Sequence, residues 1–286
     1  MNFFLNACLP IVAENGLACR PCCPSASALF LILAIMAPAL AEDKPIKSPE
    51  EMFEAQQYTA PNGEELSYRL LAPEQITGDT AYPLVIFLHG AGERGSDNLA
   101  QLKHGLRELC SPEWRKRFPC YVIAPQCPSG QRWADIDWTK QEIEAPMTIS
   151  RPLEMTLEVV DQLLDTAPID WSRIYITGLS MGGYGTWDAI YRRPNFFAAA
   201  MPICGGGDPA TAPVIQKVPI ACFHGEQDRV VSPEKSRRII QALRDLGANP
   251  IYVEYPGVGH DSWTETYSSE ENWAWMFNQT KTDPIR

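Results

Sequence analysis

Four features are scarce in this sequence, and each scarcity excludes a class of protein. The 286 residues contain no run of lysine or arginine longer than three and carry a net charge of −11 at pH 7, which argues against nucleic acid as a partner. No internal repeat is visible, which excludes solenoid and coiled-coil architectures. The longest apolar run, residues 28–37, is too short to span a bilayer as a helix. Only four histidines are present, so the choice of a catalytic base is narrow.

Residues 1–41 have the features of a secretory leader. The apolar run at 28–37 is followed by Ala-Leu-Ala at 39–41, which is the small-x-small pattern that a signal peptidase accepts. Arg20 is the only positive charge ahead of the run. We expect a signal peptide cleaved after the Ala-Leu-Ala triplet and a periplasmic or secreted protein without stable membrane insertion. An uncleaved N-terminal anchor is the alternative.

The nine cysteines fall into two groups, four within the leader and five after it. Five is an odd number, so at least one thiol is unpaired unless it bridges to another chain. Cys120 and Cys127 bracket an expected strand and would be about 20 Å apart, too far for a disulfide between them. We expect Cys204 and Cys222 to be buried free thiols, and the sequence assigns no pairing to Cys110, Cys120 or Cys127.

After the leader, the chain alternates between short apolar runs and helical patterns. Residues 42–57 are polar and are expected to form a flexible N-terminal segment, and residues 58–71, with Asn-Gly at 62–63, are expected to form a β-hairpin. Continuous apolar runs, typical of strands buried on both faces, occur at 84–88, 121–124, 174–177, 198–203, 220–223 and 251–255. Helical patterns occur at 152–166, 183–193 and 235–246. The sequence therefore predicts a single α/β domain over residues 58–286, with a mostly parallel, doubly wound sheet and an N-terminal antiparallel hairpin.

A candidate nucleophile lies between an expected strand and an expected helix. The pentapeptide Gly-Leu-Ser-Met-Gly at 178–182 fits the pattern G-x-S-x-G. A sharp turn from strand to helix at this place exposes the serine hydroxyl at the carboxyl edge of the sheet, next to a helix N-terminus. We expect Ser180 to be the nucleophile.

A serine hydroxyl needs a base that accepts its proton, and the four histidines differ in their context. His260, in the loop at 257–261, follows the last expected strand, where the chain order serine, acid, histidine places the base. His89 and His224 each end a strand in a His-Gly pair, and we expect structural hydrogen bonds from them. His104 is expected on a helix surface. His260 is therefore the predicted base.

The acid that orients the base should follow a strand between Ser180 and His260. Asp228 comes a short turn after the strand at 220–223 and is the predicted acid. Asp208 also follows a strand and is the alternative.

Two backbone amides are needed to stabilise the negative oxygen that forms during attack on a carbonyl carbon. We expect one from Met181, directly after the nucleophile, and the other from Ala91, in the glycine-rich loop at 89–95 that follows the strand at 84–88.

Three segments together resemble the secreted bacterial α/β-hydrolase esterases that are often labelled predicted peptidases, and the related phospholipase/carboxylesterase and dienelactone-hydrolase-like groups. These segments lie at 88–95, 124–128 and 175–187, and the resemblance extends over about residues 66–277. It implies the α/β-hydrolase fold and hydrolysis of carboxylic esters by Ser180, Asp228 and His260, without a metal or an organic cofactor.

The substrate is less defined than the reaction. The stretch at 205–218 is too short for a cap domain, so we expect an open site. Trp133, Trp138 and Trp263 are candidates to line it, with packing in the core or at the rim as the equal alternative. The predicted function is a serine esterase acting on small or polymer-linked esters. The alternatives are an acetyl or feruloyl esterase of polysaccharides, a serine peptidase, and a non-catalytic binding protein on the same fold.

Cleavage of the leader predicts a mature protein whose first residue is Glu42. N-terminal sequencing and intact-mass measurement of the exported protein from a bacterial host check this. A product that keeps residues 1–41 and sediments with the membranes would instead support the uncleaved anchor.

Overall fold

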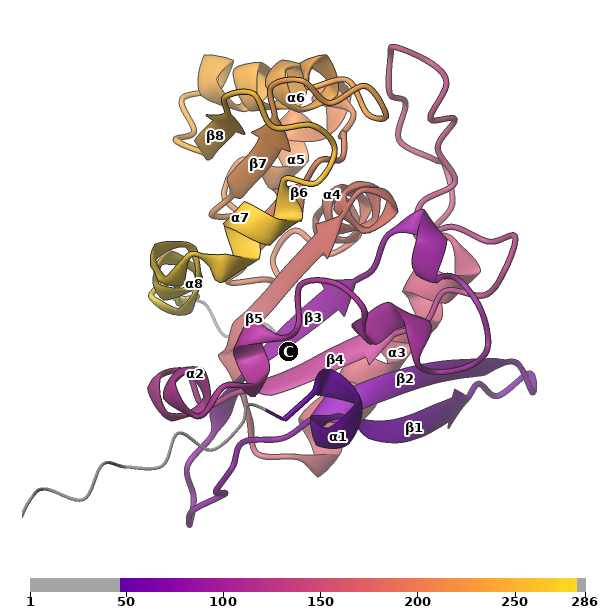
Figure 1. Ribbon diagram of the computed structural model, residues 1–286. Helices are drawn as coiled ribbons and strands as arrows, with labels where there is room; N and C mark the ends of the chain where they lie inside the picture. Colours follow the sequence, from indigo (N-terminus) through magenta and orange to yellow (C-terminus); the bar gives the residue numbers. More distant parts are fainter. Residues whose placement is uncertain (1–46, 282–286) are drawn as a thin grey trace, which may run out of the picture. The chain divides into compact units, whose positions relative to one another are not determined.

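The computed structural model describes residues 47–281, which form one sheet with helices on both of its faces. In the order in which they pair, the strands are β1 (Glu54–Thr59), β2 (Glu65–Leu71), β4 (Tyr121–Pro125), β3 (Tyr82–Leu88), β5 (Ile169–Leu179), β6 (Ala199–Ile203), β7 (Ala221–Gly225) and β8 (Ile251–Tyr255). Figure 1 shows β1 at the bottom of the sheet and β8 at the top. The expected signal peptide, residues 1–41, lies outside the described residues. The prediction of an α/β protein with a mostly parallel sheet is confirmed.

The N-terminal hairpin begins earlier than the sequence pattern indicated. Residues 42–57 were expected to be flexible, but α1 (Pro49–Met52) and most of β1 fall within them. β1 pairs antiparallel with β2 as the edge strand of the sheet. Its side chains are mostly exposed, so its sequence is polar although each of its residues is paired with β2. An edge strand of this kind gives no apolar signal in the sequence.

The parallel part of the sheet runs from β4 to β8 and contains one reversal of strand order. The chain moves from β3 to β4 on one side and then crosses to β5 on the other side of β3. In open α/β sheets, ligands bind beyond the carboxyl ends of the strands at such a reversal. The topology therefore places the expected site at the ends of β3 and β5.

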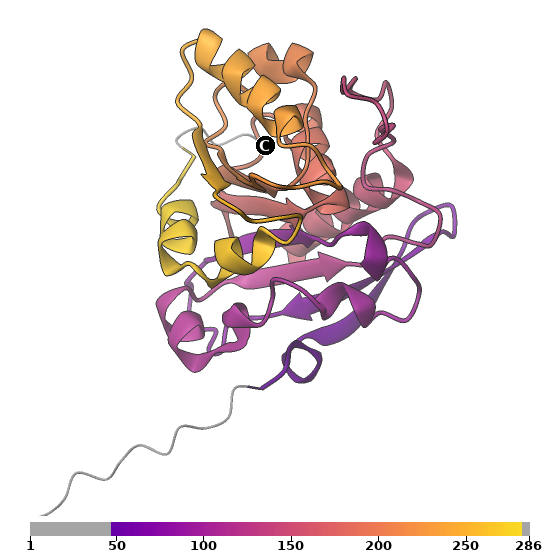
Figure 2. The same cartoon turned by 45° about the horizontal axis from the view of Figure 1, so that its top comes forward.

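Two apolar layers hold helices against the two faces of the sheet. Figure 2 shows helices on both faces. The helices of the first layer are α3 (Arg151–Thr166), α4 (Met181–Arg192), α5 (Ala212–Ile215) and α6 (Glu234–Asp245). The short 3-10 turn η4 (Pro209–Thr211) directly precedes α5. The helices and 3-10 turns of the second layer are η2 (Ala100–Leu102), η3 (Glu108–Cys110), α2 (Pro112–Arg117), α7 (Trp263–Ser268) and α8 (Glu270–Phe277). Within residues 47–281, none of the helices has the length and apolar character needed to cross a membrane.

The five cysteines of the described part of the chain are all free and buried: Cys110, Cys120, Cys127, Cys204 and Cys222. The expectation of buried free thiols at positions 204 and 222 is confirmed. Burial raises the pKa of Cys120 and of Cys222 to about 12, so these side chains stay protonated and pack as small apolar groups.

The first turn of α4 contacts the end of β3 so closely that no side chain fits between them. A Cβ atom on Gly182 would stand 1.9 Å from the carbonyl oxygen of Leu88. Because this neighbour is backbone, it cannot move aside as a flexible side chain could. Glycine at this position is therefore a condition for the contact between helix and sheet.

Replacing Gly182 by alanine should lower the free energy of unfolding by about 3 kcal/mol or more, because α4 or β3 must shift to admit the methyl group. Urea unfolding measures this change. Gly92→Ala is the control, since a Cβ atom there meets nothing within 4 Å. Equal stability of the two variants would contradict the close contact.

Candidate active site

Ser180 lies at the turn that joins β5 to α4. Its φ of 53° and ψ of −113° are rare for a residue other than glycine. The amide of Ser180 donates to the carbonyl oxygen of Ile203 on β6 at 2.9 Å, and the Ser180 carbonyl accepts from the amide of Tyr184 at 3.1 Å. These two bonds hold the strained backbone between the sheet and the first turn of the helix. Since α4 starts at Met181 and not at 183, the serine directly precedes the helix N-terminus.

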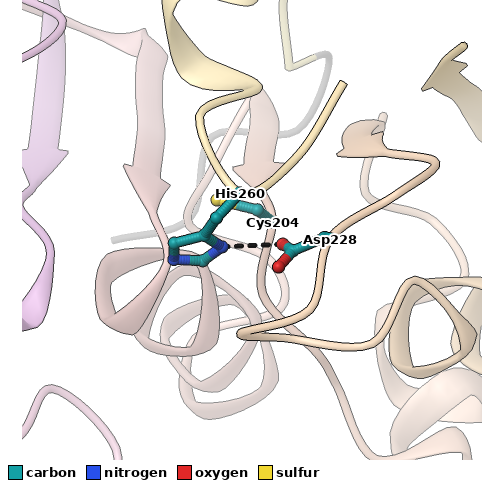
Figure 3. Close-up of side chains that lie close together, drawn as sticks. All are labelled: Cys204, Asp228 and His260. Atoms are coloured by element: carbon teal, nitrogen blue, oxygen red, sulfur yellow. Dashed lines mark hydrogen bonds and ion pairs between the residues drawn. The ribbon is translucent and has the colours of Figure 1, made fainter. Parts of the chain in front are cut away.

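His260 lies between Ser180 and Asp228. Its Nε2 atom is 2.9 Å from Ser180 Oγ, and its Nδ1 atom is 2.7 Å from Asp228 Oδ2. Because a carboxylate only accepts hydrogen bonds, Nδ1 donates and Nε2 is left to accept the serine proton. Figure 3 shows the imidazole ring facing the carboxylate. The structure thus brings together the three residues that the sequence analysis named as nucleophile, base and acid.

The base and the acid stand on the loops that follow β8 and β7. Gly225 ends β7, and a Cβ atom there would lie 2.0 Å from the carbonyl oxygen of Gly259. The two loops are therefore in direct backbone contact, and this contact sets His260 beside Asp228.

The carboxylate of Asp228 is buried and fully engaged. Its Oδ1 accepts from the amides of Val230 and Val231 at 2.8 and 2.9 Å, while Oδ2 faces His260 and also lies 3.2 Å from His224 Nε2. Burial acts to raise the pKa of Asp228, but the hydrogen bonds from His224, His260 and Val231 outweigh it and hold the pKa well below its usual range. The carboxylate therefore stays ionised and can stabilise a protonated imidazole beside it.

Asp208, the alternative acid, accepts hydrogen bonds from backbone amides that have no part in the site. Its Oδ1 accepts from the amide of Ala210 at 2.8 Å and caps η4, and its Oδ2 accepts from the amide of Ala145 at 2.9 Å. It anchors the loop before α3 and does not contact His260.

The amides of Met181 and Ala91 stand at the same edge of the sheet. Met181 is the first residue of α4, and Ala91 is the first residue of η1 (Ala91–Glu93), which follows β3. Gly178 lies shortly before Met181 and Leu88 lies shortly before Ala91, and these two residues are partners in the β3–β5 pairing. Among residues 47–281, neither amide has a hydrogen-bond acceptor. Two free N–H groups beside a nucleophile, one of them at a helix N-terminus, can bind a negative oxygen.

Hydrogen bonds from two side chains, one within the loop and one outside it, hold the loop that carries Ala91. Arg94 Nε donates to the Ala91 carbonyl at 2.9 Å, and its Nη1 donates to the Gln131 carbonyl at 3.2 Å. Gln126 Nε2 donates to the Glu93 carbonyl at 3.2 Å. These bonds fix the loop before any substrate arrives.

The three tryptophans that were candidates for a substrate cleft differ in position. The expectation that Trp133 lines a cleft is corrected by its position. It is fully buried, and its Nε1 donates to the His89 carbonyl at 3.0 Å, so it packs in the core. Trp138 is half-buried and stacks on Tyr184. Trp263 is half-buried with its ring 5.4 Å from that of His260, so among the three it alone borders the base.

Cys204 lies beneath the site, a position that sequence reasoning missed. It follows β6 with a φ of 39°, and its sulfur lies within 4.8 Å of a carboxylate oxygen of Asp228 and a ring nitrogen of His260. Figure 3 shows these three side chains together. These residue types could hold a metal ion, but the arrangement fits one poorly. Burial raises the pKa of the Cys204 thiol far above its usual range, and His260 Nδ1 is already bonded to Asp228.

The comparisons with known proteins agree with this geometry. Residues 75–272 match the description phospholipase/carboxylesterase, which covers more than half of the chain. The chain belongs to this family. The predicted α/β-hydrolase fold and the predicted class, carboxylic ester hydrolase, are thereby confirmed.

Three relatives show how far the likeness extends. Carboxylesterase SOBER1 of Arabidopsis thaliana is 27% identical over 210 residues, which are 68% of this chain and 90% of that protein. The bifunctional acetylxylan esterase/xylanase XynS20E of Neocallimastix patriciarum is 25% identical over 66% of this chain and 25% of that protein. A crystal structure of a thermostable esterase has a TM-score of 0.75 and 43% identity, over 80% of this chain and 64% of that chain. The chain thus spans most of the plant enzyme and less than two thirds of the other two.

His89 supports the loop that carries Ala91 as a neutral, buried ring. Its Nδ1 donates to the Gly90 carbonyl at 2.6 Å, and its Nε2 accepts from the amide of Cys127 at 2.9 Å. Protonation of Nε2 would break the second bond. Burial lowers the pKa of His89 to about 4, so the ring stays neutral in the folded protein.

This shift predicts a loss of stability in mild acid. The unfolded chain binds a proton at His89 near its ordinary pKa of about 6.5, whereas the folded protein does so only near 4. The contribution of His89 is thus complete above pH 6.5 and lost progressively between pH 6.5 and 4. Urea unfolding at several pH values should give a shallower decline for His89→Gln than for the wild type. Parallel declines would rule this contribution out.

Proposed function

We propose that this family member hydrolyses carboxylic esters through an acyl-enzyme on Ser180, with His260 as general base and Asp228 as the acid that orients it. The observation that carries the proposal is the unbroken line of hydrogen bonds from Ser180 Oγ through both nitrogens of His260 to Asp228 Oδ2. It supports this reaction because each bond has the polarity that proton transfer away from the serine requires.

Acylation begins when Ser180 Oγ attacks the ester carbonyl carbon. The serine proton moves to His260 Nε2, and the charge that forms on the imidazole faces the ionised carboxylate of Asp228. The carbonyl oxygen becomes negative and takes hydrogen bonds from the amides of Met181 and Ala91. His260 then returns the proton to the alcohol oxygen as the carbon–oxygen bond breaks.

Deacylation repeats the same steps with water. His260 takes a proton from the water as the water oxygen attacks the acyl carbon, and then gives that proton to Ser180 Oγ as the acid leaves. His260 acts as the base in both halves, with Ser180 as its partner in the first and water in the second, while its bond to Asp228 is kept.

The substrate we propose is a small acyl group on a larger alcohol, such as the acetyl or aromatic esters of a polysaccharide. Between β6 and β7 the chain forms only η4 and α5, so no cap domain encloses this side of the site. Ser180 and His260 are both partly exposed. Trp263 borders His260 and offers an aromatic surface to a sugar or an aromatic acyl group. The likeness to a bifunctional acetylxylan esterase/xylanase favours the same class.

Replacing Ser180 by alanine should reduce the turnover of a short p-nitrophenyl ester by about 10⁴-fold or more, because the nucleophile is lost while the fold is kept. Ser172→Ala is the matched control: it lies near the other end of β5, where its hydroxyl donates to Asp170 at 2.6 Å. A fluorophosphonate probe should label the wild type and the Ser172 variant but not Ser180→Ala. Absence of labelling and of turnover in the wild type would favour a binding protein on this fold.

A further inference from the structure

A second histidine touches the carboxylate of Asp228, and the reaction described above does not use it. His224 is fully buried at the end of β7, four residues before Asp228. Its Nε2 atom lies 3.2 Å from Asp228 Oδ2, the same oxygen that faces His260, and 2.9 Å from the carbonyl oxygen of Val231. One carboxylate oxygen therefore lies between two imidazole rings.

The partners of His224 fix where its hydrogen lies. The carbonyl of Val231 and the ionised carboxylate of Asp228 can only accept, so Nε2 must carry a hydrogen. On the other side of the ring, Nδ1 is 2.8 Å from Ser236 Oγ, which in turn donates to the Gly205 carbonyl at 3.0 Å. Whichever way the serine hydroxyl turns, the N–H group of Nε2 stays directed at the two acceptors.

His224 is itself held rigidly by a second element. Ser236 belongs to α6, is fully buried, and reaches both the His224 ring and the backbone after β6. A line of side chains thus runs from α6 through His224 and Asp228 to His260 and Ser180. A histidine with only a packing role would not need hydrogen bonds to Ser236 and Asp228, so these two contacts favour a role in the site.

Resting on the proposed function, we infer that His224 is a positioning residue for ester hydrolysis, which holds the Asp228 carboxylate in the orientation that His260 requires. With two amides on Oδ1 and two imidazoles at Oδ2, the carboxylate cannot rotate without losing a donor. The N–H group of His224 also keeps the negative charge on Asp228 when His260 becomes protonated, because it stabilises the ionised carboxylate.

The decisive variant is His224→Leu, which keeps an apolar side chain of similar bulk and removes the donor. Turnover should fall by about 10- to 100-fold, with KM nearly unchanged. This is the range found in metal sites when a residue that orients a metal-binding histidine is removed. The acid limb of the kcat/KM profile should move to higher pH, because a carboxylate that has lost one donor favours the protonated form of His260. His224→Gln, whose amide N–H can reach the same acceptors, should restore most of the turnover and the original limb.

Other groups that face His224 are the same in all these variants, so a shifted limb reports this one contact. They are the Asp228 carboxylate and Glu254, which is the partner of His224 on β8 and is itself paired with Arg237 on α6.

Phe223→Leu controls for lost packing. Phe223 is the neighbour of His224 on β7, but its side chain packs in the other apolar layer, against Tyr255. This variant should lower Tm and leave the pH profile unchanged. If His224→Leu lowers Tm in the same way while keeping the turnover and acid limb of the wild type, the inference is overturned.

A milder variant covers the case in which His224→Leu does not fold. Ser236→Ala removes the support of the ring and should shift the acid limb in the same direction by a smaller amount, whereas an unchanged profile overturns the inference. Ser180→Ala is measured beside these variants. If Ser180→Ala keeps the activity of the wild type, the proposed function is refuted. If Ser180→Ala is inactive but His224→Leu keeps the turnover and pH profile of the wild type, only the role of His224 is refuted.

Discussion

The contact between the backbone of Gly182 and the carbonyl of Leu88 determines where the serine and the free amide of Met181 stand. It brings the start of α4 against the end of β3, which leaves no length for a relaxed turn after β5. Ser180 therefore takes a positive φ, and the amide of Met181 stands free at the helix N-terminus. The loop that carries Ala91 leaves β3 at the same place, so both free amides stand at the edge of the sheet where the serine lies.

The base and the acid depend on a second contact of the same kind, at the other side of the site. Gly225 admits the backbone of the loop after β8, and so the end of β7 lies directly against the residues before His260. Two close backbone contacts, one at each side, thus fix the ends of the hydrogen-bonded line. The buried negative charge of the site is on Asp228, where four hydrogen-bond donors surround the carboxylate. Without these donors, burial of the charge would cost much free energy.

Much of this arrangement could be predicted from the sequence because buried parallel strands are apolar throughout. The run at 84–88 and the Gly-Leu-Ser-Met-Gly motif together indicated the sheet edge and the turn, and chain order indicated Asp228 and His260. β1 escaped prediction because an exposed edge strand is stabilised by its backbone, which leaves no pattern in its side chains. Trp133 was named as a cleft residue because composition does not show which side of a loop faces the core. The contact of His224 with Asp228 needs the fold of the turn between them, which no spacing rule gives.

The five buried thiols have a consequence for how the chain can mature. The cysteines of residues 47–281 form no disulfide with one another, so this part of the chain can fold without an oxidation step. A reductant therefore has no bond to break among residues 47–281.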